Sequence, residues 1–163
     1  TPVESLTPHF STPAALKAIR RATPGAIDSL TNRLPAAQWN LRPAEEEWSM
    51  VEVLCHLRDV DAEVNLPRFQ TISRGENPFL PGINSDLWAN ERGYTQSDGP
   101  AALKQFIQAR ERILQLLDGL DENGWNQPAR HAIFGPTTLL ELVSFTTTHD
   151  RNHLQQLWCN PRV

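Results

Sequence analysis

The sequence predicts an all-α protein, a four-helix bundle with a long crossover loop between its second and third helices. Four segments repeat apolar residues at steps of three or four, and none shows the sustained alternation of a strand. A chain of 163 residues is long enough for one domain with a sizeable core. We therefore expect a single domain over residues 1–163, with its core in residues 13–158.

The composition is typical of a globular protein, with 39% hydrophobic and 21% charged residues. No apolar run approaches the roughly 20 residues of a membrane helix. The N-terminus lacks the charged and then apolar order of a signal peptide, so we expect a cytoplasmic protein. The sequence begins at Thr1, as a processed or trimmed start would. The net charge of −4 and the scattered basic residues argue against nucleic-acid binding. Cys55 and Cys159 are expected to be free thiols.

The first helix is predicted to begin after "STPAAL", where Thr12 can cap it and Pro13 suits its first position. An apolar stripe then follows at Leu16, Ile19, Thr23, Ile27, Leu30 and Leu34. Pro24-Gly25 interrupts the stripe, but its register continues across the break. We expect one kinked helix.

The second helix is predicted to begin at Ser49, which forms a capping box with Glu52. Its inner stripe comprises Val53, Leu57, Val60, Val64, Phe69 and Ile72. Pro67 is expected to kink or end this helix. The lid-like segment 74–98 follows, rich in Gly, Pro, Asn and Ser, with a short helical turn expected in "SDLWAN".

The third helix is predicted to run from near Pro100 to Gly119, and its apolar stripe contains one charge, Arg110. The fourth is predicted to start with a second capping box, formed by Thr138 and Glu141. Its inner face carries Leu142, Thr146, His149, His153 and Leu157. Because the crossover is long, the second and third helices can run parallel.

Two histidines on the fourth helix, His149 and His153, lie one turn apart, with Cβ atoms about 5–6 Å from each other. Alone, such a pair is more often satisfied by hydrogen bonds in a core than by a metal. His56 changes this reading because it lies on the inner stripe of the second helix. Three neutral nitrogens would leave a fourth coordination position open, which is typical of catalytic metal sites.

Arg110 is expected to pair with a carboxylate across the bundle, Asp59 or Glu63, and a buried pair of this kind is structural first. The alternative is that Arg110 steers an anion beside the histidines. Glu52 lies one turn before His56 and either orients that imidazole or serves only as a cap.

Other residues near the histidines receive weaker expectations. Asp150 follows directly on the first histidine of the fourth helix, so it should point about 100° away and ligation is not expected. Gln156 lies on the ligand side and can touch the pocket, and His131 can approach its mouth. Cys55 is expected to face away, and no role is assigned to His9.

Three stretches together resemble the DinB-like (YfiT-type) superfamily. They are "EEEWSMVEVLCHLRDVD", "FIQARERILQLLDGL" and "FGPTTLLELVSFTTTHDRNHLQQL". The matching positions are Trp48-Ser49, His56-Leu57, Arg110, His149, His153 and Gln156. The resemblance extends from about Pro13 to Trp158.

The resemblance implies a divalent metal, zinc or nickel, held by His56, His149 and His153, and a homodimer. It implies an S-transferase that activates a small thiol of the glutathione, bacillithiol or mycothiol type, because a metal-bound thiol or water loses its proton near neutral pH. A metal-dependent hydrolase and a non-catalytic metal-binding bundle are the alternatives. The substrate would be a small molecule. Trp88 and Tyr94 are candidate pocket walls, although ordinary packing of the loop is the favoured interpretation of both.

Overall fold

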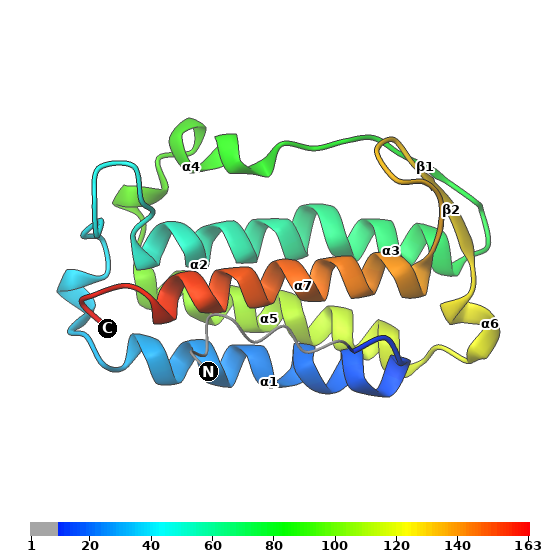
Figure 1. The fold of residues 1–163 in the computed structure, drawn as a ribbon, viewed down its shortest axis with the longest axis horizontal. Helices are drawn as coiled ribbons and strands as arrows, with labels where there is room; N and C mark the ends of the chain where they lie inside the picture. The colour runs from blue at the N-terminus through cyan, green and yellow to red at the C-terminus, as the bar shows by residue number, and fades with distance from the viewer. Residues whose placement is uncertain (1–9) are drawn as a thin grey trace.

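A computed structural model describes residues 10–163, and Figure 1 shows its long helices packed side by side. They are α1 (Pro13–Thr31), α2 (Met50–Asp59) continued by η3 (Val60–Asn65) and α3 (Leu66–Ser73), α5 (Gly99–Asp118) and α7 (Leu139–Trp158). The path from α2 to α3 runs parallel to α5, whereas α1 and α7 run the opposite way (Figure 1). The predicted bundle with its long crossover is confirmed. Within the described residues, no helix is long and apolar enough to span a membrane.

The remaining elements are short and lie in the connections. They are η2 (Ala36–Gln38), β1 (Phe79–Leu80), η4 (Ser85–Leu87), α4 (Trp88–Glu91), η5 (Tyr94–Gln96), α6 (Glu122–Trp125), β2 (Pro128–His131) and β3 (Gly135–Thr138). The strands form one sheet in which β2 pairs in parallel with β1 and antiparallel with β3. The sequence predicted no strands, and it was wrong here because runs of two to four residues are too short to show alternation.

Helix α1 runs unbroken through Pro24, as the continuous apolar register predicted. A proline has no N–H, so the carbonyl of Arg20, four residues earlier, loses its partner within the helix. The guanidinium of Arg110 on α5 donates to this carbonyl instead, with Nη1 3.1 Å from the oxygen. A bond from the neighbouring helix therefore replaces the one that the proline removes.

The predicted capping box at the start of α2 is present in both directions between Ser49 and Glu52. Pro67 does not end the helical path, which continues to Ser73. The chain reaches the proline through the π-helical turn η3, where the N–H of Leu66 bonds to the carbonyl of Asp61, five residues earlier. The proline then occupies the first turn of α3, where a missing N–H is tolerated.

At the start of α7, Thr138 caps the helix by accepting the N–H of Glu141, as predicted. In a capping box the Glu141 carboxylate would in turn accept the backbone N–H of Thr138, and this bond is not the one observed. The carboxylate of Glu141 accepts from the Thr138 hydroxyl, at 3.1 Å, rather than from the backbone N–H. One half of this predicted box is therefore present.

Two apolar clusters make up the core, one toward each end of the bundle. One contains Leu54 and Phe106, and the other contains Phe69 and Ile113. Along each helical path, a charged residue lies between the residues of one cluster and those of the other. These four side chains form a charged layer. This charged layer consists of Arg20 on α1, Asp61 on η3, Arg110 on α5 and Asp150 on α7.

Each member of the charged layer is at most 1% exposed, and each arginine contacts both aspartates. Arg110 lies 2.7 Å from Asp61 and 2.9 Å from Asp150, measured from nitrogen to carboxylate oxygen. The corresponding distances from Arg20 are 3.2 and 3.3 Å. Burial raises the pKa of Asp61, but the charges of Arg110 and Arg20 hold it below its ordinary value.

Two expectations are corrected here. Arg110 does not pair with Asp59 or Glu63, because both of these carboxylates bind Arg92 of the crossover, at 2.9 and 2.7 Å. Asp150 does not point away from the bundle, since it is 1% exposed. Helix α7 packs against α1 as well as α2, so side chains about 100° apart on it can both face inward.

Replacing Arg110 with Met is expected to lower the free energy of unfolding by about 3–5 kcal/mol, because two buried carboxylates would share one arginine. The matched control is Arg112→Met, an exposed position two residues later on α5, which should leave stability within about 0.5 kcal/mol. Urea unfolding followed by circular dichroism measures both. Equal stability of the two variants would contradict a structural role for the layer.

Candidate metal centre

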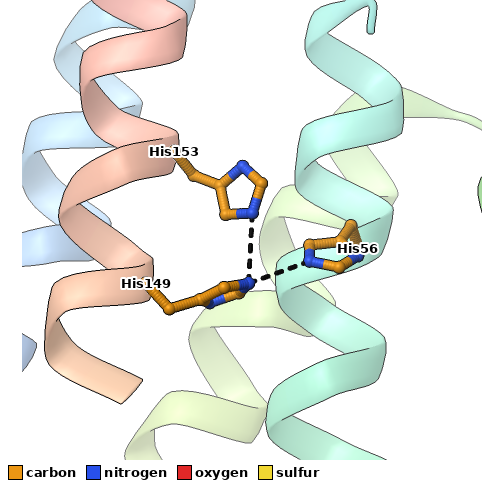
Figure 2. Close-up of side chains that lie close together, drawn as sticks. All are labelled: His56, His149 and His153. Atoms are coloured by element: carbon orange, nitrogen blue, oxygen red, sulfur yellow. Dashed lines mark hydrogen bonds between the residues drawn. The ribbon is translucent and has the colours of Figure 1, made fainter. Parts of the chain in front are cut away.

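Three histidines converge between α2 and α7 (Figure 2). His56 comes from α2, and His149 and His153 come from successive turns of α7. The Nε2 atom of His149 lies 3.0 Å from Nε2 of His56 and 3.2 Å from Nε2 of His153. One ring nitrogen from each residue lies within 4.8 Å of the others, so the group can hold a single metal ion. Sequence reasoning brought these three residues together correctly.

The three imidazoles carry too few N–H protons to form good hydrogen bonds at both of their nitrogen–nitrogen contacts. The Nδ1 atom of His153 lies 2.8 Å from the amide oxygen of Gln156, which only accepts, so this nitrogen carries the ring proton. Nε2 of His153 therefore presents a lone pair to the centre. His149 carries at most one proton on Nε2, which cannot serve both neighbours well. A cation would satisfy all three lone pairs.

Burial keeps the three imidazoles neutral. His56 is 0% exposed, and desolvation, with the nearby His153 and His149, lowers its pKa to about 3. The pKa values of His149 and His153 are also lowered, mainly by burial. Metal ions bind neutral imidazole, so the cluster is in its binding form at neutral pH without losing protons.

The predicted helpers lie in different places. Glu52 is buried, but its carboxylate binds Arg42 and the N–H of Ser49, and Nδ1 of His56 has no hydrogen-bond partner. The expected orientation of His56 by Glu52 is therefore not observed. Each nitrogen of Arg110 donates within the bundle interior, and the side chain is 0% exposed and outside the pocket lining. Gln156 is the residue that orients a histidine.

A pocket of about 550 Å³ opens beside the cluster and shares His153 with it. Its walls are Glu46, Glu47, Trp48, Asn84, Asp86, Leu87, Asn90, His153 and Gln156. Residues of the crossover thus contribute part of the lining. Another hollow, of about 510 Å³ between α1 and α6, contains neither histidine nor cysteine.

Two wall residues were missed from the sequence. The indole of Trp48 stacks on the ring of His153, with centroids 5.9 Å apart and planes 3° from parallel. The Trp-Ser pair that starts α2 was its only signal. Asp86, in η4, places Oδ1 4.0 Å from Nε2 of His56. Nothing in a Gly- and Asn-rich loop singles out this carboxylate.

The two aromatic residues predicted as pocket walls lie elsewhere. Tyr94 is 1% exposed in the core, and its hydroxyl donates to Asp59 at 2.6 Å. Trp88 packs against the core with the guanidinium of Arg92 over its ring at 4.0 Å. Neither lines the pocket, and both pack as the favoured alternative of ordinary loop packing describes.

The remaining histidines and the thiols stand apart from the cluster. His131 lies in β2, where its Nδ1 accepts the N–H of Ile133 at 3.1 Å, so it stabilises the turn to β3. Cys55 is buried and outside the histidine group, and both cysteines are free, as predicted. His9 lies outside the described residues.

Comparison with known proteins shows a family, a relative and a solved structure that this chain resembles. The model of the DinB superfamily matches residues 18–157. The uncharacterized protein YuaE of Bacillus subtilis (strain 168) is 23% identical over 131 residues, which cover 72% of this chain and 80% of YuaE. The structure of YfiT from Bacillus subtilis has a TM-score of 0.79 at 16% identity, covering 97% of this chain and 89% of that chain.

YfiT is described as a probable metal-dependent hydrolase with an unusual four-helix bundle topology. At this level of identity the likeness shows a shared fold. The family match establishes more than the fold. It extends from within α1 to the last turn of α7 and includes all three clustered histidines. The chain therefore belongs to the DinB superfamily.

Proposed function

We propose that the protein is a metal-dependent enzyme in which His56, His149 and His153 hold one divalent cation. The convergence of three neutral ring nitrogens within 4.8 Å carries this proposal. Imidazole ligands suit zinc or nickel, and three of them leave room for a reacting group. When bound, the cation supplies a positive charge that acidifies a water or thiol beside it.

Hydrolysis of a small molecule is the reaction that we propose first. The description of YfiT supports it, and so does the carboxylate of Asp86, which lies next to the cluster at the edge of the pocket. In the reaction, the oxygen of water bonds to the electrophilic carbon while the bond to the leaving group breaks. Asp86 takes one proton from the water and returns it to the leaving group.

Transfer of a small thiol is the second candidate, and the resemblance of the motifs to the S-transferases of the family supports it. The sulfur of the thiol would bond to the electrophilic carbon while the bond to the leaving group breaks, and the proton of the thiol would pass to the leaving group. We propose, as the sequence predicts, that the protein is cytoplasmic, forms a homodimer and binds no nucleic acid.

His56→Ala and His149→Ala are each expected to lose stoichiometric zinc or nickel, because two imidazoles remain where three are needed. His131→Ala is the matched control, since this histidine lies outside the cluster, and it should keep the metal. Elemental analysis of chelator-treated and reconstituted protein measures the content. Full metal in both cluster variants would show that the site is wrong.

Asp86→Asn should retain the metal and lower metal-dependent hydrolysis of p-nitrophenyl acetate by about 10²–10⁴-fold, the usual contribution of a general base. Glu91→Gln, at an exposed carboxylate of the same crossover, should leave the rate unchanged. A parallel assay with glutathione and 1-chloro-2,4-dinitrobenzene compares thiol transfer. Metal-dependent thiol transfer without hydrolysis would favour the second candidate.

The metal-free protein should lose stability as the pH falls from 7 to 5. The unfolded chain protonates His56 near pH 6.5, whereas the folded chain resists this until about pH 3. The unfolded state therefore binds more protons across this window, and His56 alone costs about 2 kcal/mol by pH 5. His56→Gln should flatten the slope in urea unfolding experiments. An unchanged slope in this variant would contradict the low pKa.

A further inference from the structure

We propose that the pocket beside the histidines selects a substrate with a positive charge, a protonated amine or a quaternary ammonium group. This inference rests on the proposed function, because it takes the pocket to be the substrate site. The three histidines define where the site lies. The charges of the other wall residues define which substrates it accepts.

Three carboxylates line the pocket from two sides. Glu46 and Glu47 precede α2, and Asp86 lies in η4 of the crossover. No lysine or arginine is among the lining residues. The remaining titratable wall residue, His153, belongs to the histidine cluster. Apart from this histidine, the lining therefore contains three acidic side chains and no basic one.

The nearby arginines form their ion pairs with other carboxylates, and only the charge of Glu46 acts on one of them, Arg42. Arg42 forms its ion pair with Glu52, at the start of α2. Arg92 of the crossover pairs with Asp59 and Glu63. Among the described residues, no arginine or lysine forms an ion pair with a carboxylate of the pocket. A hollow whose walls carry charge of one sign raises the local concentration of ions of the opposite sign.

The other walls suit an ammonium group as well. Trp48 contributes an indole, the aromatic ring that attracts cations most strongly. Asn84 and Asn90 add side-chain amides, whose oxygens accept hydrogen bonds from an ammonium. Carboxylates beside an aromatic ring favour a cation, whereas thiols such as glutathione carry carboxylates that this pocket would repel. The substrate class that fits is an ester or amide of a small amino compound.

Two probes of similar shape and opposite charge test the inference. Benzyltrimethylammonium cannot ligate a metal, and phenylmethanesulfonate does so weakly, so the pocket decides between them. Titration calorimetry on the zinc-loaded protein at low salt should show the cation bound about tenfold more tightly than the anion, given the modest strength of each exposed charge pair. Equal or tighter binding of the sulfonate would overturn the inference.

Matched variants assign the preference to the pocket. The double change Glu46→Gln and Glu47→Gln should weaken binding of the cation several-fold, since two of three wall charges are lost. Glu45→Gln removes the same charge one residue away, outside the pocket, and should leave binding unchanged. Equal effects of the two changes would overturn the inference.

Metal content measured on the same samples separates this inference from the proposed function. Stoichiometric zinc with no preference for the cation overturns the substrate class and leaves the metal centre standing. A preference for the cation that responds to Glu46 and Glu47, in protein that holds no zinc, supports the charge selection and overturns the metal centre.

Discussion

The fold depends on the charged layer in the middle of the bundle. Arg20, Asp61, Arg110 and Asp150 come from four helical segments and balance one another, so the interior gains four charges without net charge. Losing any one member would leave an unpaired charge in the core, which is costly. The layer also uses the proline in α1, because the carbonyl that Pro24 leaves free accepts a bond from Arg110. The layer therefore fixes how the helices face one another.

The charged layer also positions the histidines, because its two aspartates lie on the same helical paths as they do. Asp150 adjoins His149 on α7, and Asp61 lies five residues after His56 on the path that continues α2. When the two aspartates bind the same arginines, α2 and α7 are held in a fixed rotation and register. The imidazoles then meet at 3.0 and 3.2 Å without needing an ion to draw the helices together. Such preorganisation is what a metal site requires of its scaffold.

The histidine cluster could be predicted because helical periodicity alone places His56, His149 and His153 on inner faces. The partners of Arg110 could not be predicted in this way. Asp61 lies four residues after the buried Leu57 on the inner face of the same helical path, but spacing alone did not distinguish it from Asp59 and Glu63, and a helix packed against two others has two inner directions. The pocket walls Trp48 and Asp86 were missed because loop positions follow from tertiary contacts, which no period encodes.

The charge of the site links its two proposed tasks. Three neutral imidazoles leave both positive charges of a divalent cation uncompensated, and the charged layer cannot offset them because it is already balanced. Carboxylates are present in the pocket walls, and that of Asp86 lies 4.0 Å from Nε2 of His56. Three negative charges against two positive ones leave a net negative site even with the metal bound. The same carboxylates therefore favour retention of the cation and, through the charge that remains, an ammonium-bearing substrate over an anionic thiol.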